Sequence, residues 1–244
     1  MAQALRALRA GGLYFDGLSA YAVVQPFTVY GWDEITIAEW IYPYWPKANA
    51  YSSKFSMIGD YWIDIPALFF GADNKVDYTV LAVYWSTRRA DGSRRNYFAS
   101  IYAYRNTWVH VVRRFTSGRE YSVWVNGSRI YAATVPAEEK TVLEWDPDTA
   151  TMPERYRRFA LGANVAFFEC MKMMYGEVRI YNRALTEDEI KAIYERSALI
   201  RDGLVLLLDF SEYEGDIAYD KSGCGNHASI YGARWVVKKA LYRM

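Results

Sequence analysis

The chain has few of the residues that build covalent frameworks or metal centres. Its 244 residues include two cysteines, Cys170 and Cys224, and two histidines. Two cysteines exclude a disulfide-rich scaffold, and the lack of a CxxC motif or a Cys/His cluster argues against a zinc site. The sequence leaves open whether Cys170 and Cys224 pair with each other.

Net charge of one sign and long apolar runs are also missing. A formal net charge of +1 argues against bulk binding of nucleic acid or an anionic membrane. No stretch approaches the roughly 18 apolar residues of a membrane-spanning helix. The opening MAQALRALRA is interrupted by Arg6 and Arg9, so no signal peptide is seen. Either the protein is not exported by that route, or an exported precursor has been trimmed.

Aromatic residues, by contrast, are abundant. The chain holds 22 Tyr, 9 Trp and 11 Phe, and 52% of its residues are hydrophobic, enough to bury a full core. Tyr and Trp suit carbohydrate stacking and protein interfaces, but strands favour them in any case. Scarce Gln with frequent Tyr, Arg and Glu hints at a thermophilic source.

Most segments are short and β-rich, with Gly, Asn and Asp between them. Hairpin turns are predicted at Asp91-Gly92 and Asn126-Gly127. Residues 136–158 are polar and hold three prolines, which predicts a long loop insertion. The last strands are predicted at 203–210 and 230–237. This pattern favours an all-β, two-sheet antiparallel β-sandwich.

One short helix is predicted near residues 187–196. Thr186 is a suitable N-cap, and Glu189, three residues later, completes a capping box. Ile190, Ile193 and Tyr194 form an apolar stripe on the helix that follows.

Seven motifs, spread over nearly the whole chain, point to one fold family. They are GLYFDGLSAY at 12–21, TIAEWIYP at 36–43, WVHVV at 108–112, VWVNG at 123–127, GEVRIYNRAL at 176–185, GLVLLLDF at 203–210 and DKSGCGNHASIYG at 220–232. Together they resemble the laminin-G-like jelly-roll domains of the concanavalin A-like lectin/glucanase superfamily. The resemblance implies a single jelly-roll domain over residues 1–244, with residues 1–11 as an N-terminal tail.

The order of the motifs differs from the family's usual order. The segment 203–237 comes last here, whereas its counterpart normally precedes the YFDG motif. The chain therefore resembles a circularly permuted member, and we expect 203–237 to complete the same sandwich beside residues 12–24. Without that partner the N-terminal strands would expose an open sheet edge.

The resemblance also implies a possible structural calcium ion. Asp16, Asp220 and Asn226 match family positions that could supply oxygen ligands, and we expect Asp16 and Asp220 to lie close together. The same residues are good turn formers for ordinary backbone reasons. Where the family often has an acidic pair before its Asn-Arg motif, this chain reads Gly176-Glu177.

Candidates for catalysis are weak. Some superfamily relatives are glucanases, which need two carboxylates across a groove. The segment from Glu144 to Asp148 resembles their strand only loosely, and Pro147 breaks its alternation. Glu39 is an isolated acid, and His110 stands among valines as a core histidine would. We therefore expect no enzyme activity, with a glycoside hydrolase as the least favoured function.

The favoured function is a non-catalytic recognition module for a glycan or a protein surface. Trp45, Trp62 and Tyr84 are the predicted exposed stacking residues. The alternative is a structural or assembly protein of a virion or cell surface. The resemblance favours an extracellular or virion-surface location. A monomer is expected, with assembly by strand exchange as the other possibility.

Overall fold

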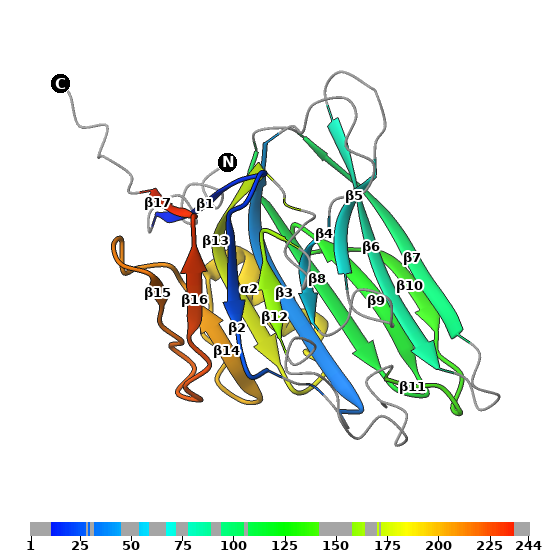
Figure 1. The fold of residues 1–244 in the computed structure, drawn as a ribbon. Helices are drawn as coiled ribbons and strands as arrows, with labels where there is room; N and C mark the ends of the chain where they lie inside the picture. Colours follow the sequence, from blue (N-terminus) through cyan, green and yellow to red (C-terminus); the bar gives the residue numbers. More distant parts are fainter. Residues whose placement is uncertain are drawn as a thin grey trace, which may run out of the picture.

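Two antiparallel sheets packed face to face, with a short helix outside one of them, make up the protein (Figure 1). The computed structural model describes residues 11–27, 29, 32–44, 54–58, 67–71, 78–88, 94–104, 107–141, 158–163, 170 and 172–236. This architecture confirms the predicted all-β sandwich.

The described strands divide between two sheets. In spatial order the first sheet contains β10 (Ser128–Thr134), β9 (Glu120–Val125), β8 (Val109–Thr116), β3 (Glu34–Pro43), β13 (Lys172–Tyr181), β1 (Gly12–Asp16) and β17 (Arg234–Val236), with β14 (Leu204–Leu208) also on β13. The second sheet contains β11 (Lys140–Thr141), β6 (Tyr78–Arg88), β5 (Ala67–Gly71), β4 (Lys54–Ile58), β12 (Phe159–Leu161), β2 (Tyr21–Val24), β16 (Ala228–Tyr231) and β15 (Ile217–Ala218), with β7 (Arg94–Tyr104) also on β6.

The strand pairing of both predicted hairpins is confirmed: β6 pairs antiparallel with β7, and β9 pairs with β10. The predicted turn residues Asp91 and Gly92 lie outside the described part of the chain. Between β9 and β10, Asn126 and Gly127 have φ values of 49° and 77°. A tight two-residue turn that joins twisted strands requires this left-handed backbone, which Asn and Gly adopt most readily.

The C-terminal strands lie beside the N-terminal strands in both sheets. Ala228 of β16 pairs with Val24 of β2, and Val236 of β17 pairs with Gly12 of β1. β14 pairs with the second half of β13, in line with β1, which pairs with the first half. The first and last described strands are therefore neighbours at one edge of the sandwich (Figure 1).

Two details of the predicted strands were wrong. Residues 230–237 do not form one strand, because Gly232 turns the chain at φ 68° and passes it from β16 in the second sheet to β17 in the first. The predicted loop 136–158 is partly strand, since Lys140–Thr141 pairs with Arg88 and Thr87 of β6. Residues 142–157 lie outside the described part of the chain.

The predicted helix is confirmed as α2 (Glu187–Arg196), with Thr186 as N-cap and a complete capping box with Glu189. Its buried residues Ile190 and Ile193 pack on the outer face of the first sheet, against side chains such as Val112 and Trp124. The main core, between the sheets, includes Phe15, Phe115, Phe159 and Phe210. Among the described residues no helix is long and apolar enough to cross a membrane.

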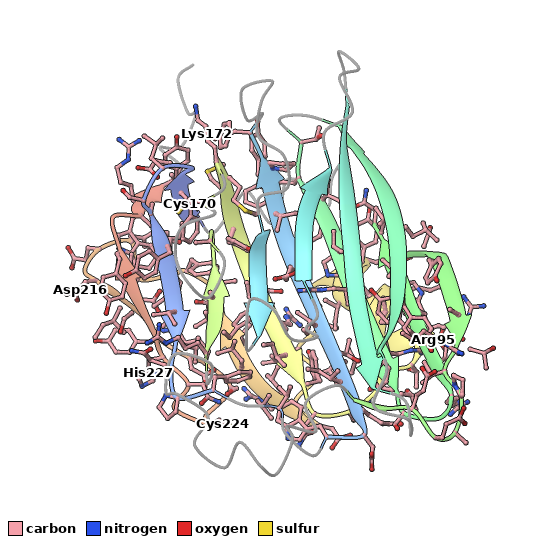
Figure 2. All side chains as sticks on the ribbon, turned by 45° about the vertical axis from the view of Figure 1, so that its right-hand side comes forward. Arg95, Cys170, Lys172, Asp216, Cys224 and His227 are labelled. Atoms are coloured by element: carbon pink, nitrogen blue, oxygen red, sulfur yellow. The ribbon has the colours of Figure 1, made fainter. Side chains whose placement is uncertain are left out.

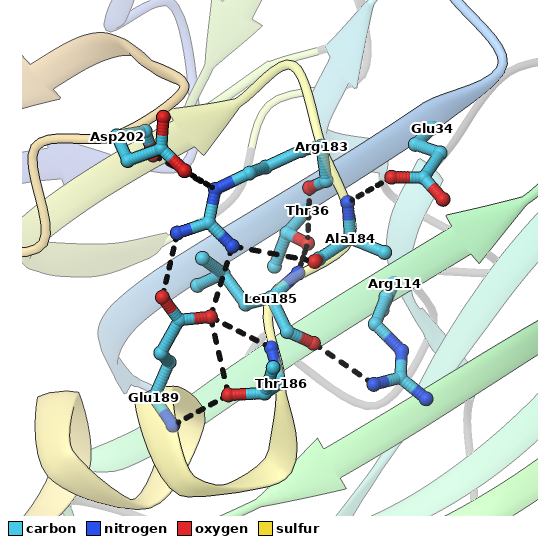
Figure 3. Close-up of polar contacts among 9 residues, drawn as sticks. All are labelled: Glu34, Thr36, Arg114, Arg183, Ala184, Leu185, Thr186, Glu189 and Asp202. Carbon is cyan, nitrogen blue, oxygen red and sulfur yellow. Dashed lines mark hydrogen bonds and ion pairs between the residues drawn. The ribbon is translucent and has the colours of Figure 1, made fainter.

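A polar network holds the segment that leads into α2 against the first sheet (Figure 3). The Arg183 guanidinium donates to Glu189 at 2.6 Å and also contacts Asp202 at 2.9 Å. The hydrogen bond from Arg183 lowers the pKa of Glu189 to about 2, so the pair stays charged at neutral pH. Thr36 Oγ1, on β3, donates to the Arg183 carbonyl and accepts from the Leu185 amide. The network thus sets where α2 sits on the sheet.

Candidate functional site

An aromatic cluster covers the outer face of the first sheet beside α2. It consists of Tyr14, Trp40, Tyr42, Tyr44, Trp108, Met174 and Tyr194, which we call the outer aromatic cluster. The alternation of β3 places Ile37, Glu39 and Ile41 toward the core and Trp40 and Tyr42 on the opposite face. The cluster therefore follows from the strand period, with further residues supplied by β1, β13 and α2.

A glycine makes room for the floor of the cluster. A Cβ atom at Gly176 would lie 2.9 Å from the Trp108 ring, closer than side chains pack. The register of β13 also shifts between Tyr175 and Glu177, at this glycine. The Trp108 indole consequently lies close against β13 and is only 8% exposed.

Three partly exposed tyrosines lie around this floor. Tyr42 and Tyr14 both pair with Met174, from the two neighbouring strands, so the three side chains form one row across the sheet. The Tyr44 ring meets the Tyr14 ring edge-on at 5.6 Å, and its hydroxyl lies 3.7 Å from Met174 Sδ. Tyr42 contacts Trp108 at 5.4 Å between ring centroids. The result is a set of half-buried rings fixed on a rigid sheet.

The Tyr44 phenol is available as a neutral hydrogen-bonding group. Burial, followed by the neighbouring Tyr42 and Tyr14, raises the pKa of Tyr44. At neutral pH its hydroxyl therefore remains protonated and can donate or accept a hydrogen bond. Flat apolar rings with polar tips suit a ligand that has both apolar faces and hydroxyls.

His110 lies beneath the α2 side of the cluster. Its ring is 4.9 Å from Trp40 and 5.8 Å from Tyr194, and it is 1% exposed. The prediction of a buried His110 is confirmed, but neither ring nitrogen has a hydrogen-bond partner in the described part of the protein. Burial, helped by the charge of Arg179, lowers its pKa to about 3. His110 is therefore uncharged at neutral pH and serves as a packing residue beneath Trp40 and Tyr194.

His110 should make the fold sensitive to mild acid. Below pH 6.5 the unfolded chain protonates this histidine, whereas the folded protein keeps it neutral down to about pH 3. Stability present above pH 6.5 is therefore lost as the pH falls. We expect the free energy of unfolding to drop by about 2 kcal/mol between pH 7 and pH 5. His110→Phe should remove most of this loss, and denaturant titrations at the two pH values measure it.

The second histidine supplies the control for that measurement. His227→Gln changes an exposed residue and should keep the pH dependence of the parent protein. Carboxylates with lowered pKa values, such as Glu189, also stabilise the folded state, but this stabilisation is lost only below pH 5 and does not affect the comparison of pH 7 with pH 5. Equal pH dependence in the His110→Phe variant and the parent protein would contradict the assignment.

The predicted stacking residues are not among those of the cluster. Trp45 and Trp62 lie outside the described residues. Tyr84 is on β6, opposite Ala67 and Phe98, and the structure describes its backbone only. The three therefore stay predictions. A signal for the cluster was present in the sequence, because Trp40, Tyr42 and Tyr44 recur with the period of a strand.

The expectation that Asp16 and Asp220 lie close together was wrong. Asp16 pairs with Lys172 on β13, whereas Asp220 accepts from the amide of Leu207, which pairs with Arg179. Seven residues along β13 separate the two positions, which is roughly 20 Å. A single calcium ion cannot reach both carboxylates. Figure 2 labels Lys172 and His227, neighbours of the two acids, near opposite ends of the sandwich.

Each of the predicted calcium ligands has a structural role in its own turn. Asp16 Oδ1 accepts from the amides of residues 18, 19 and 20. Asp220 accepts from the amide and the hydroxyl of Ser222 and from the amide of Asn226, whose side chain donates to Val205. Burial alone would raise the Asp220 pKa, but hydrogen bonds from Leu207 and Ser222 hold it below its usual value. The possible structural calcium ion itself stays a prediction.

The structure also shows where other residues considered in the sequence analysis lie. Glu39 faces the core, not an edge, and pairs with Arg113 at 2.6 Å with both side chains fully buried. Residues 144–148 lie outside the described part. His227 Nδ1 accepts a hydrogen bond from the Asp220 amide at 3.0 Å. Cys170 and Cys224 are free thiols and appear near opposite ends of the sandwich in Figure 2.

Comparison with known proteins shows the fold. No protein-family model matches the chain, and no curated protein matches its sequence. A solved structure from Bacteroides ovatus, of a protein to which carbohydrate binding is attributed, is similar with a TM-score of 0.63 and 17% identity. The similarity covers 94% of this chain and 61% of that one. The heptameric SAP-like pentraxin of Limulus polyphemus is similar with a TM-score of 0.51 and 12% identity, over 77% and 83% of the two chains.

The chain thus spans about three fifths of the Bacteroides protein. At identities this low the likeness concerns the fold alone. The chain has a β-sandwich fold similar to the folds of these two proteins.

Proposed function

We propose that the chain is a non-catalytic recognition module that binds carbohydrate through the outer aromatic cluster. The observation that carries the proposal is the arrangement of Tyr14, Tyr42 and Tyr44 as partly exposed rings over the buried Trp108. Sugar rings have apolar C–H faces and polar rims, which such side chains match. The carbohydrate binding attributed to the Bacteroides protein of similar fold supports the same reading.

Rigid positioning favours this surface as a binding site. Tyr14 on β1 and Tyr42 on β3 flank β13 in one sheet, and packing against Met174 and Trp108 fixes the orientation of the rings. A ligand that stacks on them therefore orders few side chains, which lowers the entropic cost of binding.

Removing the exposed rings should weaken glycan binding. A glycan array first identifies a ligand, and calorimetry then compares Tyr14→Ala and Tyr44→Ala with the parent protein. We expect each substitution to raise Kd about tenfold or more, as for a central aromatic contact. Tyr219→Ala changes an exposed tyrosine that follows β15 of the second sheet, so it is the matched control and should leave Kd unchanged. Loss of binding in the control alone would refute the proposed site.

A structural or assembly protein is the second candidate, and one observation favours it. Among the described residues, five of the eight exposed large apolar side chains gather in the C-terminal segment: Tyr213, Ile217, Tyr219, Tyr231 and Val236. Such a concentration is typical of an interaction surface. Light scattering separates the candidates, because a recognition module should remain monomeric at concentrations where an assembly protein forms oligomers.

A further inference from the structure

Two cations flank the outer aromatic cluster. Lys172 Nζ lies 5.9 Å from the Tyr44 ring centroid, and the Arg234 guanidinium lies 5.0 Å from the Tyr14 ring centroid. Figure 2 labels Lys172 at the upper end of the sandwich. Both cations thus lie against the two rings for which we propose sugar contacts.

The pairing of the strands places the two cations on either side of β1. Lys172 on β13 pairs with Asp16, and Arg234 on β17 pairs with Tyr14. Two strand spacings and two residues along β1 put their backbones on the order of 12 Å apart. An extended ligand lying across Tyr14 could therefore meet a cation at each end.

Two acids of the described part of this face, Asp16 and Glu177, have other hydrogen-bond partners. Asp16 accepts from three backbone amides of its own turn. Both carboxylate oxygens of Glu177 bind Arg179. Within the described residues neither Lys172 nor Arg234 forms an ion pair. Their positive charge is therefore not matched by a contacting carboxylate of the described chain.

We infer that the ligand of the outer aromatic cluster is an acidic saccharide, one that carries carboxylate or sulfate groups. This inference rests on the proposed function and adds the charge of its ligand. A ring contact limits the motion of each cation and leaves its other side open to an anion. A guanidinium binds carboxylate or sulfate oxygens through two parallel hydrogen bonds, and an ammonium attracts them as a point charge. A neutral saccharide would gain little from either cation.

The test compares saccharides that differ in charge alone. An oligogalacturonate is matched with its methyl ester, and dextran sulfate with dextran, in calorimetric titrations of the full chain. We expect one of the charged probes to bind at least tenfold more tightly than its neutral counterpart. That binding should weaken between about 50 mM and about 300 mM NaCl, because salt screens exposed charges.

Charge-removing variants locate the contact. Lys172→Gln and Arg234→Gln should each weaken binding of the charged probe several-fold and leave the neutral probe unaffected. Lys191→Gln removes an exposed cation of α2 and is the matched control, which should bind as the parent protein does. Unchanged melting temperatures show that the variants are folded.

The outcomes separate this inference from the proposed function. Equal binding of charged and neutral probes, with no effect of Lys172→Gln or Arg234→Gln, overturns the acidic ligand and leaves a carbohydrate site. Equal weakening by Lys191→Gln also overturns it, because binding would then follow net charge. If all saccharides fail to bind, or if binding survives Tyr14→Ala and Tyr44→Ala, the proposed function itself fails.

Discussion

A chain that ends at Ser197 is expected to lose its cooperative unfolding transition and to aggregate. The truncation removes β14, β15, β16 and β17 together. β2 then loses its neighbour β16, and β1 loses its neighbour β17. The inter-sheet core also loses buried residues such as Leu206, Leu208 and Phe210. Each such side chain stabilises the fold by about 1.5–3 kcal/mol, against a total of about 5–15 kcal/mol for a typical domain.

Thermal unfolding followed by circular dichroism, with light scattering, measures this effect. A chain that ends at Val236 is the control, because it keeps every described strand and should melt as the parent protein does. A soluble 1–197 fragment with a cooperative transition would contradict the account. If the truncated chain instead recovers its fold on addition of a 203–236 peptide, the removed strands are shown to supply the missing partners.

A permuted chain tests the same pairing without loss of residues. Val236 pairs with Gly12, so a short linker could join residues 203–236 to the front of residues 11–197. We expect this chain to fold, and its motif order would match that of the laminin-G-like domains it resembles.

Short sequence motifs were sufficient to predict the elements whose formation depends on a few neighbouring residues. The turn at Asn126-Gly127 predicts the β9–β10 hairpin, because it needs left-handed backbone at both positions. The capping box of Thr186 and Glu189 predicts where α2 begins. In contrast, nothing local in residues 230–237 tells that Gly232 passes the chain from one sheet to the other.

The site was less predictable, because its residues come from distant parts of the chain. Trp40, Tyr42 and Tyr44 share a strand period, but Trp108 and Tyr14 join them only through the order β8-β3-β13-β1. Similarly, the expected approach of Asp16 to Asp220 ignored that β1 and β14 pair with different halves of β13. Two strands that pair with the same partner strand can thus lie far apart along the axis of that partner.

The buried ion pair inside the sandwich gives the largest expected effect of a single substitution. Glu39 lies between Val111 and Val178 in the first sheet, both core residues, and binds Arg113. Glu39→Gln would leave the guanidinium buried without this counter-charge. Breaking a buried pair in this way costs about 3–5 kcal/mol, a large part of the stability of a typical domain. Denaturant unfolding measures the loss.

A neighbouring pair supplies the control. Arg114 follows Arg113 on β8, but points to the outer face and binds Glu120, with exposed fractions of 16% and 26%. Glu120→Gln should therefore cost about 1 kcal/mol or less, because solvent screens the lost charge. If Glu39→Gln costs no more than Glu120→Gln, the interior pair does not have the assigned role.

The double variant Glu39→Leu/Arg113→Met shows which part of the cost is electrostatic. It removes both charges and keeps apolar volume between the sheets, so it should recover most of the stability that Glu39→Gln loses. Recovery would mean that the cost of the single substitution comes from the Arg113 charge once Glu39 no longer balances it. A double variant as unstable as the single one would instead mean that the polar contacts of this pair organise the interior. Because Glu39 faces the core in either case, it is not a carboxylate that a saccharide on the outer face could reach.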